Sequence, residues 1–193
     1  MQLTTPRTIL SVTALLFLFG GLGRAISSPP ADDSVTRAAA VVRGRYLVGA
    51  MGCNDCHTPW KLGPKGPEPD MSRALSGHPA DFAVTAPPRL EGPWAWSATA
   101  TNTAFAGPWG VSFTANLTPD AETGLGRWTA DTFIAALRTG RHEGKGRPIL
   151  PPMPYRMIGT LTDDDLRSVF AYLQSLPPIR NRVPAPIDPD EHQ

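Results

Sequence analysis

The sequence predicts a small all-α domain that is interrupted by a long loop insertion rich in proline and glycine. Near the carboxyl end, apolar residues from Leu166 to Leu173 recur at the spacing of one helix face. No segment alternates polar and apolar residues with the period of two that is typical of strands. Eight prolines between residues 59 and 93 break any long element there, so residues 59–115 are expected to form the insertion.

Residues 1–25 have the pattern of a secretory signal peptide. A positive charge at Arg7 precedes an uncharged apolar run from Thr8 to Gly23, and Gly23 and Ala25 are the small residues expected before a cleavage site. The alternative is an uncleaved membrane anchor, but the run is shorter than the roughly 20 residues that span a bilayer. We therefore expect export, with cleavage after Ala25.

A linker and a first helix are expected between the signal and the cysteines. Residues 26–36 are rich in proline, serine and aspartate and show no apolar periodicity, which indicates a mobile linker. The next residues, to Met51, are strong helix formers, and Gly52 is of the type that commonly follows a helix end. We assign residues 37–179 to one helical domain.

Two further helices are predicted downstream, each with its own capping residue. Thr129 can cap a helix that Gly140 closes. Thr162 and Asp165 form a capping pattern for the last helix, which ends before Pro177.

The first and last helices are expected to pack against each other. Gly44 has no side chain and would allow a close approach of the two backbones next to the Leu166–Leu173 stripe. The remaining residues, 180–193, are polar and rich in proline, and we expect a flexible tail.

The two cysteines of the chain, Cys53 and Cys56, lie three positions apart, and His57 follows at once. Two thiols at this spacing can form thioether bonds to the two vinyl groups on one edge of haem, and the histidine can bind the iron. The motif predicts one covalently bound haem c. Cys53 and Cys56 would be the attachment residues and His57 the proximal iron ligand.

Other uses of the two thiols fit the sequence less well. A disulfide between residues three apart closes a very small loop and constrains the unfolded chain little. A thioredoxin-like redox pair is expected beside a strand in a β-α-β pattern, which is absent here. A structural zinc site needs four ligands at regular spacing, and the other histidines, His78, His142 and His192, are scattered.

The order of helix, "CNDCH", long loop, helix, "PPMPY" and capped last helix resembles the class I c-type cytochromes. The stretch "ANLTPDAETGLGRWTADTFIAALRTGRHEGKGRPILPPMPY" is similar to segments of the cytochrome c subunits and domains of membrane-associated bacterial alcohol and aldehyde dehydrogenases. The resemblance extends from Val42 to Pro184. It implies a cytochrome c-like fold for the helical domain.

The resemblance also implies a methionine as the distal iron ligand, carried in a Met-Pro sequence shortly before the last helix. Met153 in "PPMPY" matches this position, and its flanking prolines would stiffen the loop. Met157 is the competing methionine. His142, His78 or an open distal position remain as further alternatives.

An iron that is held on both faces leaves no position for a substrate, so one-electron transfer is the chemistry that remains. We expect a periplasmic electron carrier, or the electron-accepting subunit of a dehydrogenase that feeds a respiratory chain, and not an enzyme. Its partners would be a dehydrogenase, a terminal oxidase or both, which could also hold it at the membrane surface. An open distal position would instead indicate a haem peroxidase or a gas-binding sensor. The 18 basic and 17 acidic residues lack the basic excess that nucleic-acid binding requires.

Overall fold

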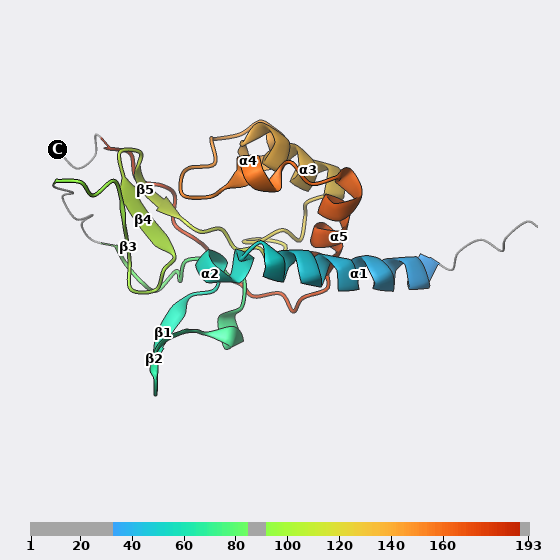
Figure 1. The fold of residues 1–193 in the computed structure, drawn as a ribbon, viewed down its shortest axis with the longest axis horizontal. Coiled ribbons are helices and arrows are strands. Elements are labelled where there is room, and N and C mark those ends of the chain that lie inside the picture. The colour runs from blue at the N-terminus through green and yellow to red at the C-terminus, as the bar shows by residue number, and fades with distance from the viewer. Residues whose placement is uncertain (1–32, 85–91, 190–193) are drawn as a thin grey trace, which may run out of the picture. The chain divides into compact units, whose positions relative to one another are not determined.

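The computed structural model describes residues 33–84 and 92–189 (Figure 1). The predicted signal peptide, residues 1–25, lies outside the described residues. None of the helices in the described part of the chain is long and apolar enough to cross a bilayer. In chain order the elements are α1 (Asp33–Ala50), α2 (Cys53–His57), β1 (Trp60–Gly63), β2 (Gly66–Pro69), the 3-10 turn η1 (Met71–Arg73), β3 (Ser97–Ala98), β4 (Ala104–Gly107), β5 (Gly110–Phe113), α3 (Ala130–Thr139), the 3-10 turn η2 (His142–Gly144), α4 (Tyr155–Ile158) and α5 (Asp163–Gln174).

Helix α1 begins inside the predicted linker. Residues 26–32 lie outside the described residues, but Asp33 to Thr36 already form the first turn of α1. The last proline before this turn is Pro30. Helix α1 therefore starts at Asp33, inside the range 26–36 that the sequence assigns to the linker.

Helices α1 and α5 pack against each other at Gly44, as the sequence predicts. Gly44 is buried, and a Cβ atom there would overlap the Ser168 carbonyl group and lie 2.8 Å from the Tyr172 Cβ atom. Glycine thus permits a backbone approach that any larger residue would prevent.

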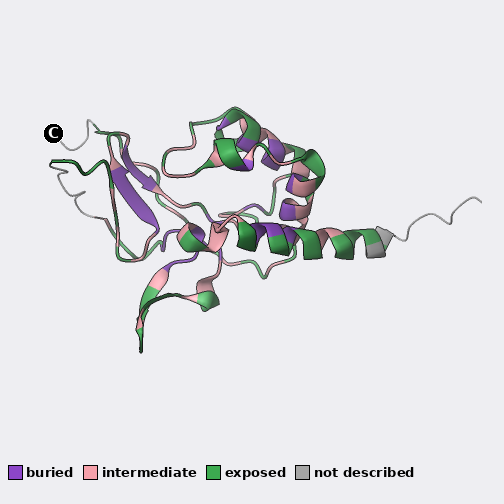
Figure 2. Cartoon of the chain, in the orientation of Figure 1, coloured by how far each residue is buried: buried purple, intermediate pink, exposed green. Residues whose placement is uncertain are grey.

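The apolar stripe of α5 faces the main core. Leu166, Val169 and Leu173 have exposed fractions of 0%, 2% and 1%. Figure 2 shows the buried turns of α1, α3 and α5 that contribute to this core. Each large apolar side chain buried in this way stabilises the fold by about 1.5–3 kcal/mol. The other buried members of the core are Leu47, Val48, Leu75, Leu125, Phe133, Ile134, Leu137 and Ile158.

The ends of α3 and α5 carry the predicted caps. The Thr129 side chain accepts a hydrogen bond from the Thr132 amide, and the Thr162 side chain accepts one from the Asp165 amide at 3.2 Å. Gly140 closes α3 with a φ of 67°, a conformation that glycine adopts without strain. These two helices are therefore determined by local sequence.

The expectation of an all-α domain needs correction in the insertion. Strands β1 and β2 form an antiparallel hairpin in which Gly63 faces Gly66. Strands β3, β4 and β5 form a second antiparallel sheet, with Gly107 facing Gly110 at the β4–β5 turn. These strands are at most four residues long, and three consecutive residues of β4 are buried. Alternation with a period of two is therefore not visible in the sequence.

Two residues of the segment predicted as a flexible tail make hydrogen bonds to the insertion. Val111 of β5 and Ile187 exchange two backbone hydrogen bonds, of 2.8 and 3.0 Å. Asn181 is buried, with an exposed fraction of 4%. Ile187 contacts the insertion through its backbone and Asn181 through its side chain.

Candidate cofactor site

Helix α2 presents the cysteine motif directly after α1. Gly52 separates the two helices with φ 67° and ψ 28°, which is the left-handed region that glycine favours. Thr58 ends α2, and its hydroxyl donates a hydrogen bond of 2.9 Å to the Asn54 side-chain oxygen. Cys53 and Cys56 are free thiols, each partly exposed. The two thiols thus lie on one short helix and are free to form covalent bonds.

His57 is held as a neutral imidazole with one ring nitrogen available. The residue is buried, and Nδ1 lies 2.8 Å from the carbonyl oxygen of Ala115, so Nδ1 carries the proton and donates it. Among the described residues, Nε2 has no hydrogen-bond partner. Burial lowers the pKa of His57, and the bond to Ala115 opposes this shift. An imidazole fixed through Nδ1 is the usual arrangement of a histidine that binds metal through Nε2.

The electrostatic surroundings of the thiols do not favour a redox-active dithiol. Burial raises the pKa of Cys53 to about 11, and the nearby Asp55 carboxylate adds to the shift. Burial and Asp55 also raise the pKa of Cys56. Reactive cysteines have the opposite environment, with a lowered pKa next to positive charge.

The zinc alternative also finds no support in the described ranges. No group of three histidine, cysteine, aspartate or glutamate residues comes together there in a geometry that could hold a metal ion. His78 is fully buried, and both of its ring nitrogens are hydrogen-bonded, to Thr103 and to Phe82. His142 packs edge-on against Trp128, with ring centroids 5.1 Å apart.

The two candidate distal methionines differ in their environments. Met153 is partly buried and packs against the main core, as do Met51 and Cys53. It lines an open hollow of about 380 Å³ together with prolines 151, 152 and 154. Met157, on α4, is 58% exposed and is not part of this core. Of the two methionines, only Met153 is thus packed against the main core.

The residues present fit a covalently bound haem. Two uncrosslinked thiols lie on the short helix that also carries a neutral histidine with an unpaired Nε2. Met153 contacts the same core as Cys53. Cysteine thioether bonds, an imidazole and a methionine sulfur are the groups that hold haem c in electron carriers.

Sequence reasoning missed the backbone acceptor of the histidine. The Ala115 carbonyl orients His57 from 58 residues away. No side-chain pattern marks a main-chain acceptor, although the stretch that resembles cytochrome subunits begins at Ala115. Asn116 and Asn181 were also missed. Both are buried, with exposed fractions of 3% and 4%, and single asparagines do not stand out in a loop-rich sequence.

Comparison with known proteins identifies relatives of the chain. It is 31% identical over 158 residues to a subunit of the nicotinate dehydrogenase of Pseudomonas putida, covering 82% of this chain and 10% of that protein. It is 29% identical over 175 residues to the fructose dehydrogenase cytochrome subunit of Gluconobacter japonicus, covering 91% and 29%. It is 28% identical over 163 residues to the alcohol dehydrogenase (quinone) cytochrome c subunit of Gluconobacter oxydans, covering 84% and 27%.

These similarities confirm the predicted resemblance to c-type cytochromes. Within that class, the chain resembles the cytochrome subunits of dehydrogenases, which are electron-transfer subunits and not catalytic ones. The chain spans between 10% and 29% of the length of the three relatives. It matches no protein-family model.

Proposed function

We propose that this chain is a mono-haem c-type cytochrome with a cytochrome c-like fold that carries single electrons. The observation that carries the proposal is the "CNDCH" motif on α2, with His57 fixed through Nδ1 and Nε2 left unpaired. The sequence contains this motif once, which supports one haem for the printed chain. Cytochrome subunits of dehydrogenases among the relatives support the same class of protein.

Four residues hold the cofactor in this proposal. Cys53 and Cys56 form the thioether bonds, His57 is the proximal iron ligand, and Met153 is the distal one. Haem, when bound, supplies a one-electron couple at the iron. Partial burial of Met153 against the core favours it over the exposed Met157. The chain would supply the His57 and Met153 ligands, and the apolar core against which Met153 packs would border the cofactor.

The sequence and the relatives support a proposal for the site of action and the partners. The signal-like residues 1–25 support export to the periplasm, with an uncleaved anchor in the inner membrane as the alternative. Dehydrogenase subunits among the relatives support a dehydrogenase as electron donor. A terminal oxidase would receive the electrons, and a partner could hold the cytochrome at the membrane surface.

The first experiment measures the intact mass of the exported protein. In a bacterium that matures c-type cytochromes, the mass should equal the chain from about Ile26 plus one haem. The double variant Cys53→Ser, Cys56→Ser should lose the covalent haem while still being exported. A wild-type protein without haem under these conditions would overturn the proposal.

The second experiment compares Met153→Ala with Met157→Ala in the haem-bearing protein. Loss of a thioether ligand opens the iron, so Met153→Ala should lower the potential, admit carbon monoxide and abolish the weak sulfur-to-iron absorption of the ferric protein. Met157→Ala should leave all three unchanged. The reverse result assigns the ligand to Met157. Carbon monoxide binding by the wild-type protein would favour a peroxidase or gas sensor instead.

A further inference from the structure

Residues 75–78, here called the bridging segment, connect α2 to the segment that carries Ala115. On one side, the Gly77 amide donates to the His57 carbonyl oxygen at 2.8 Å, and the Leu75 amide donates to the Thr58 hydroxyl at 2.9 Å. All four residues of the bridging segment are buried. The bridging segment is thus bonded directly to the backbone of the histidine that is proposed to bind iron.

The other side of the bridging segment holds residues 114–117. The His78 amide donates to the Thr114 carbonyl oxygen at 2.9 Å, and the Leu117 amide donates to the Leu75 carbonyl oxygen at 2.8 Å. These two bonds flank Ala115, whose carbonyl accepts the Nδ1 proton of His57. The position of that acceptor therefore depends on the bridging segment.

Gly77 brings the two segments into close contact. Its φ is 78°, and a Cβ atom at this position would overlap the Thr114 carbonyl oxygen and lie 2.6 Å from both the carbonyl carbon and the carbonyl oxygen of Ala115. A side chain there would push against the group that accepts the histidine proton. The Ala115 side chain is exposed, so its own packing contributes little to fixing this carbonyl.

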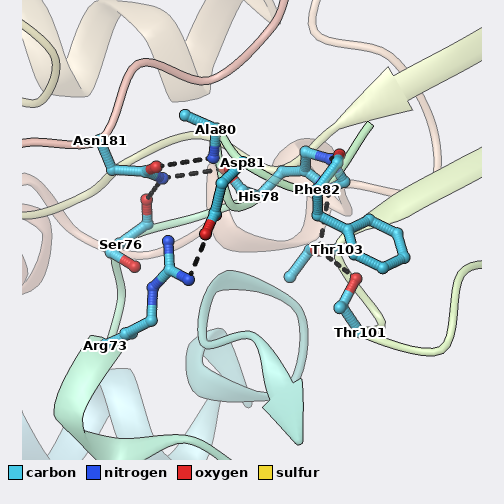
Figure 3. Close-up of polar contacts among 9 residues, drawn as sticks. All are labelled: Arg73, Ser76, His78, Ala80, Asp81, Phe82, Thr101, Thr103 and Asn181. Atoms are coloured by element: carbon cyan, nitrogen blue, oxygen red, sulfur yellow. Dashed lines mark hydrogen bonds and ion pairs between the residues drawn. The ribbon is translucent and has the colours of Figure 1, made fainter. Parts of the chain in front are cut away.

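The side chain of Asn181, from the carboxyl-terminal segment, is hydrogen-bonded to the bridging segment, as Figure 3 shows. Its Nδ2 donates to the Ser76 carbonyl at 2.7 Å and to the His78 carbonyl at 2.8 Å, and its Oδ1 accepts from the Ala80 amide at 2.9 Å. The side chain is buried and uses both donors and its acceptor on this one turn. No hydrogen bond of the Asn181 side chain reaches the helical core among the described residues.

We propose that Asn181 is a positioning residue for His57. It acts through the bridging segment on the Ala115 carbonyl, and it thereby sets the strength of the hydrogen bond at Nδ1. A hydrogen bond at this nitrogen raises the basicity of the imidazole and stabilises ferric iron. The carboxyl-terminal segment therefore lowers the reduction potential of the haem. This inference rests on the proposed function, since it requires His57 to bind iron.

The test uses three uncharged variants of the full, haem-bearing protein. Asn181→Ala removes the three hydrogen bonds. Asn181→Ser replaces the amide by a shorter side chain with one hydroxyl group. Gly77→Ala pushes on the carbonyl groups of Thr114 and Ala115. Each should shift the midpoint potential upward, with the smallest shift in Asn181→Ser. In the reduced, diamagnetic protein, the Nδ1 proton of His57 should exchange faster with solvent when followed by heteronuclear NMR.

Two controls separate this effect from general loosening. Gly92→Ala places a side chain at another positive φ, 66°, where no atom of the described residues lies within 4 Å. Pro178→Ala changes an exposed, uncharged residue three positions before Asn181. Both should keep the wild-type potential and Nδ1 exchange rate.

The outcomes are distinguishable. Haem-bearing Asn181 variants with the wild-type potential and exchange rate overturn the positioning role and leave the proposed function intact. A wild-type protein that carries no haem overturns the proposed function itself. If Gly77→Ala does not fold, the two Asn181 variants decide the result, and Asn181→Ser is the mildest of the three.

Discussion

The packed helices bury leucine, valine and phenylalanine side chains, whereas the loops around the bridging segment bury hydroxyl, amide and imidazole groups. The main core joins α1, α3 and α5. The buried polar residues are His57, Thr58, Ser76, His78, Thr103, Ser112, Asn116, Thr118 and Asn181. A substitution in the apolar core lowers stability mainly through the volume that it removes. A substitution in the polar region lowers stability when it leaves a buried group without its hydrogen-bond partner.

This difference has a functional consequence. The helical core contacts Cys53 and Met153 through packing. The polar region orients His57 through a directional bond to a backbone carbonyl. Packing therefore shapes the cofactor surroundings, and the hydrogen-bond network sets the orientation of one ligand. Four predictions test how far the two regions behave differently.

The largest effect is expected in the helical core. Leu173→Ala removes a side chain that is 1% exposed, and it should lower the free energy of unfolding by about 2–5 kcal/mol. Urea unfolding followed by circular dichroism measures the change. A loss below about 0.5 kcal/mol would show that the α5 stripe does not face the core.

A smaller loss is expected at the crossing of α1 and α5. Gly44→Ala forces a methyl group onto the Ser168 carbonyl, and overpacking of this kind costs about 1–3 kcal/mol. The matched control is Gly49→Ala in the same helix, where the described part of the chain places no atom within 4 Å. That change should stabilise the protein by about 0.5–1 kcal/mol, because alanine favours the helix. Equal effects at both positions would contradict the close crossing.

The third prediction concerns acid sensitivity in the polar region. Burial lowers the pKa of His78, the bond to the Phe82 carbonyl opposes this shift, and Arg73 adds to it. The folded protein therefore favours neutral His78, while the unfolded chain takes up a proton near the ordinary histidine pKa of about 6.5. Stability should fall as the pH drops from 7 to 5.

The matched comparison for this prediction is His78→Gln, measured by urea unfolding at the two pH values. The variant should show a shallower pH dependence, although it loses stability at both. His142, whose pKa is also lowered by burial, is present in both proteins and cancels in the comparison. An identical slope in the two proteins would show that the pKa of His78 does not differ between the folded and unfolded chain in this range.

The smallest effect is expected in the β1–β2 hairpin. Leu62 is 85% exposed, so Leu62→Ala should change the free energy of unfolding by no more than about 0.5 kcal/mol. Leu62→Ala is the exposed counterpart of Leu173→Ala, and the same urea unfolding experiment measures both. A loss comparable to that of the core variant would mean that the hairpin packs more extensively than its exposure indicates.

The sequence by itself determined the helices and the motif whose signals come from residues close together in the chain. Helical periodicity and capping residues define α3 and α5 because their signals lie within one or two turns of the chain. The five residues of "CNDCH" define the cofactor motif for the same reason, and a glycine at position 44 predicts the close crossing of two helices.

The tertiary structure decided the features that depend on backbone atoms far apart in the sequence, namely the sheets, the tail contacts and the orientation of His57. Short, fully buried strands leave no alternation, so the two sheets are set by pairing and not by pattern. The tail is bonded to β5, to Asn116 and Thr123, and through Asn181 to the Ser76 carbonyl, which lies more than 100 residues earlier in the chain. The orientation of His57 comes from the Ala115 carbonyl. Every residue has a backbone carbonyl, so the sequence does not indicate which one accepts the histidine proton.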